Sequence, residues 1–553
     1  MTKRRARPAA PAPVAAPPPP DTTRFLRWEG PLFVGIAAVL VIALGYLSRK
    51  AMNPDGVSYL DLADAVRRGD WTHLVQGYWS PLLPLIAGAA GGVLGLGHSA
   101  SIALVHGINV DAAIIALGIL FVWARRIESP TMLVGSVAAF FLASAGMPRL
   151  EAVTPDIILF AVMIALSYEL AFHHGRRSLV TGILLGAAYL VKTSCWPWLV
   201  VTLVVRLFAA RDRDARTLVL RSTGISLIVM ALWIVPLSIK SGRPTLGSSG
   251  RLNYSWYIDA NTSRLPDVDL GGNGAYREVR APNNQLVTVA TFNDAAYWTY
   301  QPWGDPTSWA QQVTTETGGS PTVVALIAYW LRQSGRIIGL WLLPMVVTVL
   351  LPIWYLRRRD GLWRDALGTD RDAAVVTVLG TVGVLQFAAI HAEPRLIAPF
   401  AMMLALGALQ WWCRPAAVPM TTRLPRSGQL AMMSIGLVAG VAFAVPKFVE
   451  GVTSAARLDV VTEKLEEVRA RLGTGDAPID VAIVGPAAPV LSAAYLIGAH
   501  ITGQVLPRSA RIVESLPTEQ KSALLTQLFG SRAVLVWESQ DDGAMQMLLL
   551  PRS

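Results

Sequence analysis

The sequence has few charged residues. Only 15% of its 553 residues are Asp, Glu, Lys or Arg, whereas 53% are hydrophobic and the mean hydropathy is +0.44. Soluble globular proteins rarely have this composition. The apolar residues fall into runs of about 17 to 22, which is the length that crosses a bilayer. The scarcity of charge therefore excludes an ordinary soluble domain and indicates an integral membrane protein.

Several motifs are also missing. The two cysteines, Cys195 and Cys413, end predicted spans on opposite faces of the membrane, so no disulfide is expected between them. No His and Cys cluster has ligand spacing, so no obligatory metal is predicted, although scattered carboxylates leave a divalent metal open. The segment VAIVGPAAP lacks a GxGxxG series, which argues against a nucleotide site. No internal repeat is apparent, which counts against a secondary transporter.

The net charge of +11 does not indicate a nucleic-acid partner. Lys and Arg cluster in short connections between the apolar runs, as orientation by positive charge requires. Residues 1–30 are basic and proline-rich, and they predict a disordered cytoplasmic tail. No small-residue cleavage site precedes the polar segment after the first apolar run, so residues 31–47 are predicted to be a retained span.

Placing the basic clusters in the cytoplasm predicts an all-α polytopic bundle of about eleven transmembrane helices with exterior juxtamembrane helices. The chain must cross the membrane an odd number of times between the first exterior loop and the next cytoplasmic connection, so one of the two apolar segments there does not cross. The shorter, glycine-rich segment 81–97 is predicted to be juxtamembrane or re-entrant. The amino terminus is then cytoplasmic and the carboxyl terminus extracytoplasmic, in a bacterial inner membrane. The predicted spans are 31–47, 100–124, 130–147, 155–172, 178–194, 196–210, 219–238, 335–356, 373–391, 396–413 and 428–446.

The predicted transmembrane domain covers residues 31–447, with exterior loops at 48–99 and 239–334. The second loop is rich in Tyr, Trp, Asn and Pro, which is typical of sugar-binding surfaces and equally of interfacial anchors. Residues 448–553 alternate strand and helix patterns, and they predict a small extracytoplasmic α/β domain.

The first exterior loop contains apolar residues at helical spacing from Val57 to Val66. This spacing predicts a short amphipathic helix that lies on the membrane. Asp61, Asp64 and Arg68 fall on its other face, where we expect them to be solvated.

Ionisable residues gather at the predicted exterior ends of the spans, and such residues at membrane depth usually mark function. Asp55 is one of them, with capping of the following helix as its alternative. Arg395 is another, because its guanidinium is a rigid fork that suits an anionic group, and an arginine reaching lipid headgroups is the alternative. The other candidates are Lys192, His391, Arg149, Tyr59, Glu151, Asp156 and Glu393.

Some of these candidates have structural alternatives. Arg149 has Glu151 as a nearby ion-pair partner, and Asp156 follows Pro155 at a predicted helix start, where capping is common. His391 is equally compatible with assisting a phosphate and with a satisfied polar group at a helix end.

The order of five segments resembles the C superfamily of glycosyltransferases, and it is most similar to the branch of aminoarabinose transferases and protein O-mannosyltransferases. These segments are PDGVSYLDLA, YWSPLLPL, MPRLEAVTPDIILF, GILLGAAYLVKTS and AEPRLIAPF, and the resemblance covers roughly residues 31 to 413. It implies transfer of a sugar from a polyprenyl-phosphate carrier on the exterior face, with inversion at the anomeric carbon and Asp55 as the base. Many relatives have a second acid after this position, whereas Gly56 follows here.

The sequence thus predicts a membrane glycosyltransferase whose partners are a polyprenyl-phosphate-linked sugar and membrane lipid. Such a reaction needs a carboxylate to orient the acceptor hydroxyl and cations to hold the phosphate. Asp55 is the candidate for the first role and Arg395 the first candidate for the second. The further candidates are Lys192, His391 and Arg149 for the phosphate, and Tyr59, Glu151, Asp156 and Glu393 for the sugar or acceptor. The sugar and the acceptor, which is a lipid, a polysaccharide or a protein, are not specified by the sequence. The alternatives are a secondary transporter or flippase of envelope lipids and a non-catalytic scaffold for envelope assembly.

Overall fold

The structure is a computed structural model. It describes residues 29–126, 149–173, 175–257, 274–292, 297–306, 323–337, 371–413, parts of 438–470, 479–530 except 486, 533–537 and 545–549. The predicted cytoplasmic tail lies almost wholly outside these residues.

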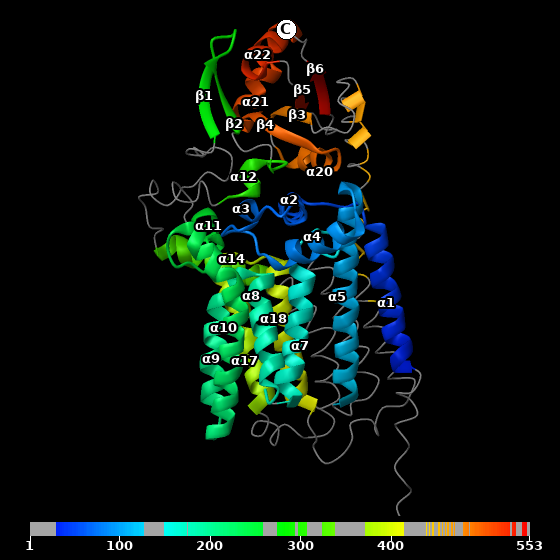
Figure 1. The fold of residues 1–553 in the computed structure, drawn as a ribbon, viewed down its shortest axis with the longest axis vertical. Helices are drawn as coiled ribbons and strands as arrows, with labels where there is room; N and C mark the ends of the chain where they lie inside the picture. The colour runs from blue at the N-terminus through cyan, green and yellow to red at the C-terminus, as the bar shows by residue number, and fades with distance from the viewer. Residues whose placement is uncertain are drawn as a thin grey trace, which may run out of the picture.

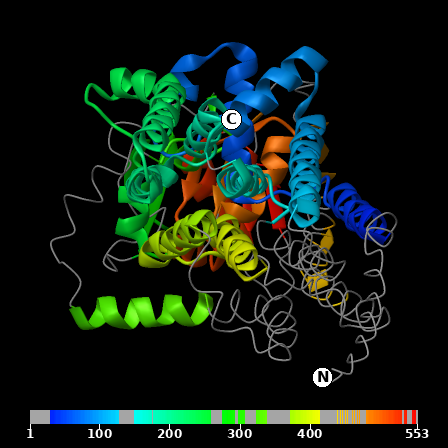
Figure 2. The ribbon, with the colours of Figure 1, turned by 90° about the horizontal axis from the view of Figure 1, so that it is seen from below.

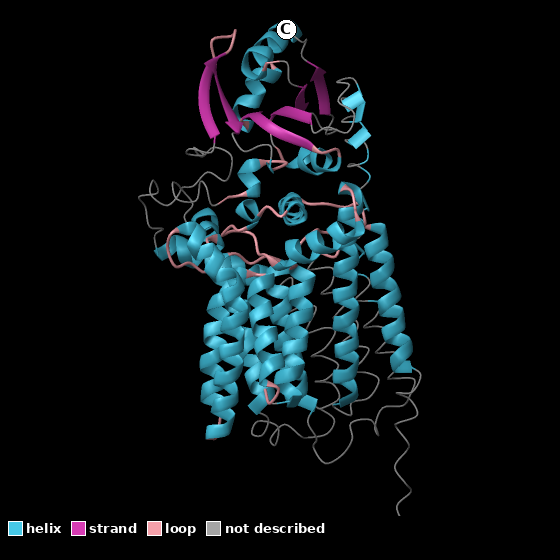
Figure 3. Cartoon of the chain, viewed as in Figure 1, coloured by secondary structure: helices cyan, strands magenta, loops and turns pink. Residues whose placement is uncertain are grey.

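A bundle of long helices forms one end of the molecule and a mixed sheet forms the other (Figure 1). Figure 3 shows the same division, with the strands above the helices. The bundle helices are α1 (Glu29–Leu47), α5 (His98–Arg126), α7 (Asp156–His173), α8 (Ser178–Val191), α9 (Trp196–Ala209), α10 (Arg213–Ser241), α17 (Arg371–Ile390) and α18 (Pro394–Cys413). We call the end of the bundle nearest the sheet its upper end.

Four helical segments are long and apolar enough to cross a membrane, judged by length and composition within the described residues. They are Ala100–Trp123, Asp156–His173, Arg213–Ser241 and Arg371–Ala389. This confirms that the chain is an integral membrane protein. The count of about eleven spans stays a prediction, because the predicted spans 130–147, 335–356 and 428–446 lie wholly or largely outside the described residues.

Short helices lie at the upper end of the bundle. They are α2 (Pro54–Arg68), α3 (Trp71–Leu74), α4 (Leu82–Leu94), the 3₁₀ turn η2 (Thr193–Cys195), α11 (Ser249–Tyr257), α12 (Gln301–Gly304) and α14 (Val323–Ile337). Helix α4 has 13 residues, which makes it about 20 Å long and too short to cross a bilayer. It packs on α2, as the predicted non-crossing segment requires. Seen from below, α14 lies across the view while the bundle helices are seen end-on (Figure 2).

Contrary to the prediction, helix α2 does not lie open on a membrane surface. Its residues from Gly56 to Ala65 are buried, between α4 and the sheet end of the molecule. Asp61 and Asp64 are 6% and 7% exposed, so the expectation of a solvated acidic face is wrong. Asp61 accepts hydrogen bonds from Thr299, and Asp64 pairs with Arg67, so both carboxylates have partners in the interior.

The sheet has six strands in the order β1-β2-β4-β3-β5-β6. Strands β3, β4 and β5 pair in parallel, and β1–β2, β2–β4 and β5–β6 pair antiparallel. The strands are β1 (Gly274–Arg280), β2 (Leu286–Phe292), β3 (Ile479–Val484), β4 (Ala499–Val505), β5 (Ala533–Trp537) and β6 (Met545–Leu549).

Helices cover both faces of this sheet. They are α20 (Ala488–Leu496), α21 (Pro507–Glu514) and α22 (Thr518–Phe529). Val481 and Ile483 pack into the same core as α2 and α20, whereas Ala482 and Val484 pack with α21 and α22, which is the alternation expected of a strand buried on both faces. Strands β1 and β2 come from the second exterior loop, and their place in this sheet has no counterpart in the sequence prediction. The predicted limits of the domains stay a prediction.

Helices α17 and α18 form a close antiparallel hairpin whose turn contains His391 and Glu393. A Cβ added at Gly383 of α17 would overlap the ring of Phe400 on α18, and one added at Gly380 would overlap the backbone of Leu404. Small residues at such crossings let helix backbones approach closely, which drives helix association in membranes.

We expect Gly383→Ala to separate this hairpin and to destabilise the protein by about 1–3 kcal/mol, because the added methyl group overpacks the crossing. Thermal unfolding in detergent measures the loss. Gly224→Ala on α10 is the matched control, since a Cβ there meets no atom within 4 Å. Equal melting temperatures for the two variants would contradict the close crossing.

Candidate active site

A cavity of about 470 Å³ lies at the upper end of the bundle, beneath α2. Asp55 enters its lining from the first turn of α2, and Asp156 from the first turn of α7. Lys192 follows the last residue of α8, and the α17–α18 turn adds His391, Glu393 and Arg395. The fold thus brings together residues that come from four separate parts of the chain.

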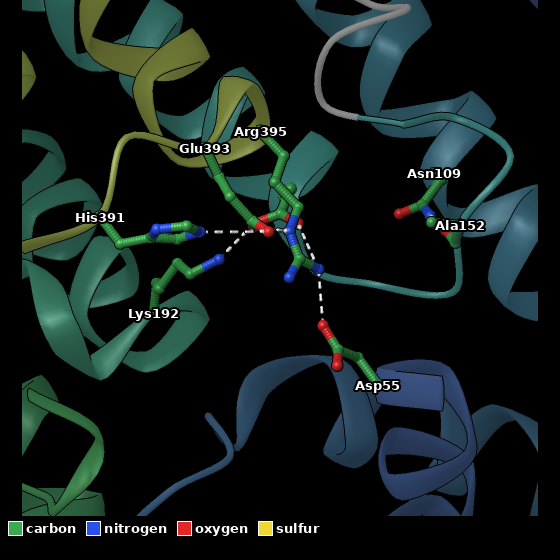
Figure 4. Close-up of polar contacts among 8 residues, drawn as sticks. Asp55, Asn109, Ala152, Lys192, His391, Glu393 and Arg395 are labelled. Carbon is green, nitrogen blue, oxygen red and sulfur yellow. Dashed lines mark hydrogen bonds and ion pairs between the residues drawn. The ribbon is translucent and has the colours of Figure 1, made fainter. Parts of the chain in front are cut away.

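Arg395 lies at the centre of an ionic network in this cavity (Figure 4). Its Nη1 donates to Asp55 Oδ2 at 2.7 Å and lies 3.8 Å from Asp156 Oδ2. Its Nε donates to Glu393 Oε2 at 2.6 Å. The planar guanidinium therefore contacts carboxylates from α2, from α7 and from the α17–α18 turn. Lysine cannot reproduce this geometry.

A second cation completes the network. Lys192 Nζ donates to Asp156 Oδ1, so that Asp156 lies between Lys192 and Arg395. Asp156 is 0% exposed, and an ionised carboxylate at that depth requires compensating charge. His391 Nε2 lies 3.5 Å from Glu393 Oε1, on the same side of the cavity as Lys192 in Figure 4.

The charges of the network nearly balance. The two permanent cations, Lys192 and Arg395, face the carboxylates of Asp55, Asp156 and Glu393, with His391 beside them. Both cations therefore already have carboxylate partners. An anionic ligand competes with these carboxylates for the cations, and Asp55, at 18% exposed, is more accessible than the fully buried Asp156.

Tyr59 and Glu393 are among the cavity residues whose pKa values are displaced. Burial, with the nearby charges of Asp156 and Asp55, raises the pKa of Tyr59 well above its ordinary value, so its hydroxyl keeps its proton. Burial alone would raise the pKa of Glu393, but the hydrogen bond from His391 and the charge of Arg395 outweigh it and hold that pKa well below its usual range. Glu393 is therefore a permanent anion that orients Arg395.

Helix α5 holds the two acid-bearing segments in place. His106 Nε2 lies 2.8 Å from the carbonyl oxygen of Ala51, shortly before Asp55, and its Nδ1 lies 3.2 Å from that of Leu150. Asn109 Nδ2 donates to the carbonyl oxygen of Ala152 at 3.2 Å, which fixes the loop that leads to Asp156 (Figure 4).

The structure separates the predicted site residues into two groups. The first group lines the cavity, and its members are Asp55, Tyr59, Asp156, Lys192, His391, Glu393 and Arg395. Arg149 and Glu151 do not line it; Arg149 is half-buried in the loop before α7 with φ +61°. The N-cap of α2 is Asn53, so Asp55 does not occupy the capping position that was its alternative.

Aromatic residues that the sequence analysis did not single out form another part of the cavity wall. Tyr78 and Trp79 line it, and Trp79 makes edge-to-face contacts with both Tyr59 and Trp303. Trp79 Nε1 donates to the carbonyl oxygen of Trp303 at 2.9 Å, which fixes the ring. Tyr254, from the aromatic second loop, lines the same cavity. In the sequence, the aromatic pair that precedes SPLLPL was the signal that could have pointed to Tyr78 and Trp79.

Among the residues that the structure describes, no group of three or more His, Cys, Asp or Glu is arranged to hold a metal ion. The carboxylates of the cavity instead face Lys192 and Arg395. The absence of an obligatory metal stays a prediction.

Comparison with solved structures identifies a similar fold. The crystal structure of ArnT from Cupriavidus metallidurans bound to undecaprenyl phosphate matches 94% of this chain and 96% of that chain, with 14% identity and a TM-score of 0.51. The chain has the ArnT fold. At 14% identity this similarity concerns the fold alone.

The structure of ArnT from the same organism in the apo state matches 91% of this chain and 92% of that chain, with 14% identity and a TM-score of 0.47. No family model and no curated protein sequence matches the chain.

Asp61 fastens α2, and with it Asp55, to the segment that leads into α12. Its Oδ2 accepts from the Thr299 N–H at 3.0 Å and its Oδ1 from the Thr299 hydroxyl at 2.8 Å. Burial raises the pKa of Asp61 from 3.8 to about 7, and the hydrogen bonds from Thr299 oppose this shift only in part. The folded protein therefore holds a proton on Asp61 at pH values where the unfolded chain has lost it.

We expect the stability of the protein to fall as pH rises from about 4 to about 7, by at most about 4 kcal/mol from this group. Asp61→Asn cannot ionise and should remove this part of the slope, as seen in melting temperatures measured across that range. Asp480→Asn, exposed on β3, is the control and should keep the slope. An unchanged slope in Asp61→Asn would contradict the retention of a proton on Asp61 in the folded protein.

Proposed function

We propose that the protein is an inverting glycosyltransferase that moves a sugar from a polyprenyl-phosphate carrier to an acceptor hydroxyl. The reaction takes place in the cavity beneath α2, on the extracytoplasmic side of a bacterial inner membrane. The observation that carries the proposal is the pairing of Asp55 with Arg395 in a cavity that also contains Lys192. A candidate base and two phosphate-binding cations therefore lie within one small space, at the end of a membrane bundle with the ArnT fold.

Asp55 takes the proton from the acceptor hydroxyl. The acceptor oxygen then forms a bond to the anomeric carbon, while the bond between that carbon and the phosphate oxygen breaks. The electron pair of the broken bond leaves with the polyprenyl phosphate, whose negative charge rises from about one to about two. Arg395 and Lys192 stabilise this added charge, and such fixed cations in a site shielded from water are a large source of rate enhancement.

Binding of the donor frees the base. A phosphate oxygen competes with Asp55 for Nη1 of Arg395, because guanidinium forks bind phosphate and carboxylate alike. The deeply buried Asp156 stays with Lys192, and Glu393 keeps Nε of Arg395 in place. Asp55 is then released toward the acceptor only when the donor is bound.

The cavity has the size and lining that a sugar requires. Its volume of about 470 Å³ lies within the usual range for small-molecule sites, about 300–1,000 Å³. Tyr78, Trp79 and Tyr254 supply flat apolar faces next to hydrogen-bonding groups, as carbohydrate recognition requires.

Replacing Asp55 with Asn should lower sugar transfer by about 10²–10⁴-fold, since the base is lost while the shape is kept. Purified protein is given a panel of polyprenyl-phosphate sugars with envelope extract as acceptor, and release of polyprenyl phosphate is measured. Asp480→Asn is the matched control and should transfer as the wild type does. Transfer that survives in Asp55→Asn would remove Asp55 as the base, and no release from any donor would contradict the transferase itself.

Replacing Arg395 with Lys should weaken binding of undecaprenyl phosphate by about tenfold, because lysine keeps the charge but loses the fork. Affinity is measured for the purified protein in detergent. Arg243→Lys, an exposed residue beyond the upper end of α10, is the control. Equal affinity in wild type and Arg395→Lys would show that Arg395 does not hold the carrier phosphate.

A further inference from the structure

A second cavity, of about 520 Å³, lies at the other end of the same helices. Helices α7 and α9 begin at the active site and end at this cavity, and α17 begins at the cavity and ends at the active site. Figure 2 looks onto this end of the bundle. The proposed reaction uses none of the residues that line this second cavity.

A buried arginine forms part of its wall. Arg206 of α9 is only 6% exposed, and its Nη1 donates to Ser222 Oγ of α10 at 2.9 Å. Within the described part of the chain, no carboxylate forms an ion pair with it. A guanidinium has five N–H donors and a permanent charge, and burying that charge without an anion is costly. A negative ligand in this cavity would offset that charge.

The loop before α8 is shaped around this guanidinium. Gly175 has φ +65°, and a Cβ at this position would lie 2.7 Å from Nη2 of Arg206. Glycine thus leaves room for the arginine to lie against the loop backbone and to keep its remaining donors at the cavity wall.

Three further arginines, Arg176, Arg211 and Arg371, line the same cavity and are exposed at its mouth. The amino-terminal ends of α10 and α17 also contribute lining residues, and helix amino termini favour anions.

The cavity also has acidic residues, namely Asp212, Asp214 and Asp372. Asp212 caps α10 by accepting from the Ala215 N–H at 2.7 Å, and the other two lie in the first turns of α10 and α17. Asp212 thus serves the end of α10, whereas Arg206 lies in the wall between α9 and α10.

The cavity lies at the depth of lipid headgroups. Helix α10 has 29 residues and is therefore about 43 Å long, which matches a bilayer of about 40–45 Å including its headgroups. With its upper end at one surface of the membrane, its first turn reaches the headgroups of the opposite leaflet. The phosphate of a lipid in that leaflet is thus held at the level of Arg206, whereas a soluble phosphate is not.

We infer that this cavity binds the phosphate of an anionic phospholipid from the leaflet opposite the active site. Arg206 donates to the phosphate oxygens from the cavity wall, and the three arginines at the mouth attract the headgroup. Arginine suits this role because its planar fork pairs with two phosphate oxygens at once.

The test is thermal unfolding of the full chain in neutral detergent, during titration with phosphatidylglycerol, phosphatidylcholine or glycerol phosphate. Phosphatidylglycerol alone should raise the melting temperature. Arg206→Gln should need about tenfold more of this lipid for the same shift, because charge-assisted hydrogen bonds are lost. Should Arg206→Gln fold poorly, the double variant Arg176→Gln with Arg371→Gln changes only exposed residues and should weaken the response in the same direction.

Arg216→Gln is the matched control, since Arg216 is exposed on α10 near this end but does not line the cavity. It should respond to phosphatidylglycerol as the wild type does. An equal response in the cavity variants and the control would overturn the proposed site. Equal stabilisation by glycerol phosphate would overturn the lipid and assign the cavity to a soluble phosphate ester.

Discussion

The burial of Asp156 is the constraint on which the active site depends. This carboxylate is fully buried at the upper end of a membrane bundle, where an unpaired charge is strongly unfavourable. Lys192 and Arg395 supply the compensating charge from α8 and from the α17–α18 turn. The packing of three parts of the bundle is therefore linked to one carboxylate. Because Arg395 must reach Asp156, it also lies within reach of Asp55, and the candidate base is positioned by the same contact.

The sequence was sufficient to predict which residues share this end of the bundle, because the positions of the basic clusters predict the direction of each span and hence the level of each span end. It could not predict which of them meet. Asp55 and Arg395 are 340 residues apart, and their contact depends on how helices pack, which hydropathy does not encode. Arg149 is predicted at the same end of the spans as Asp156, and yet it does not line the cavity. Its loop is held to α5 through Leu150 and Ala152.

The pattern of α2 was recognised, but its surroundings were not. An amphipathic helix with acids on one face looks the same in sequence whether water or protein covers that face. Here the residues around Thr299 and the sheet end of the molecule cover it, so Asp61 is buried and partly neutralised by a raised pKa. The strands β1 and β2 were missed for a similar reason. They pair with each other locally, but their place in the sheet depends on β4, which lies more than 200 residues later.

A base that is paired at rest has a consequence for the proposed reaction. A carboxylate that was always free in this cavity could activate water as readily as an acceptor, and the donor sugar would then be lost by hydrolysis. While Arg395 holds Asp55, this carboxylate is engaged in an ion pair. In the proposed reaction, the donor phosphate competes for the guanidinium, so Asp55 is released at the moment when the anomeric carbon is in place. In the proposed reaction, the same guanidinium binds the leaving group and holds the base at rest.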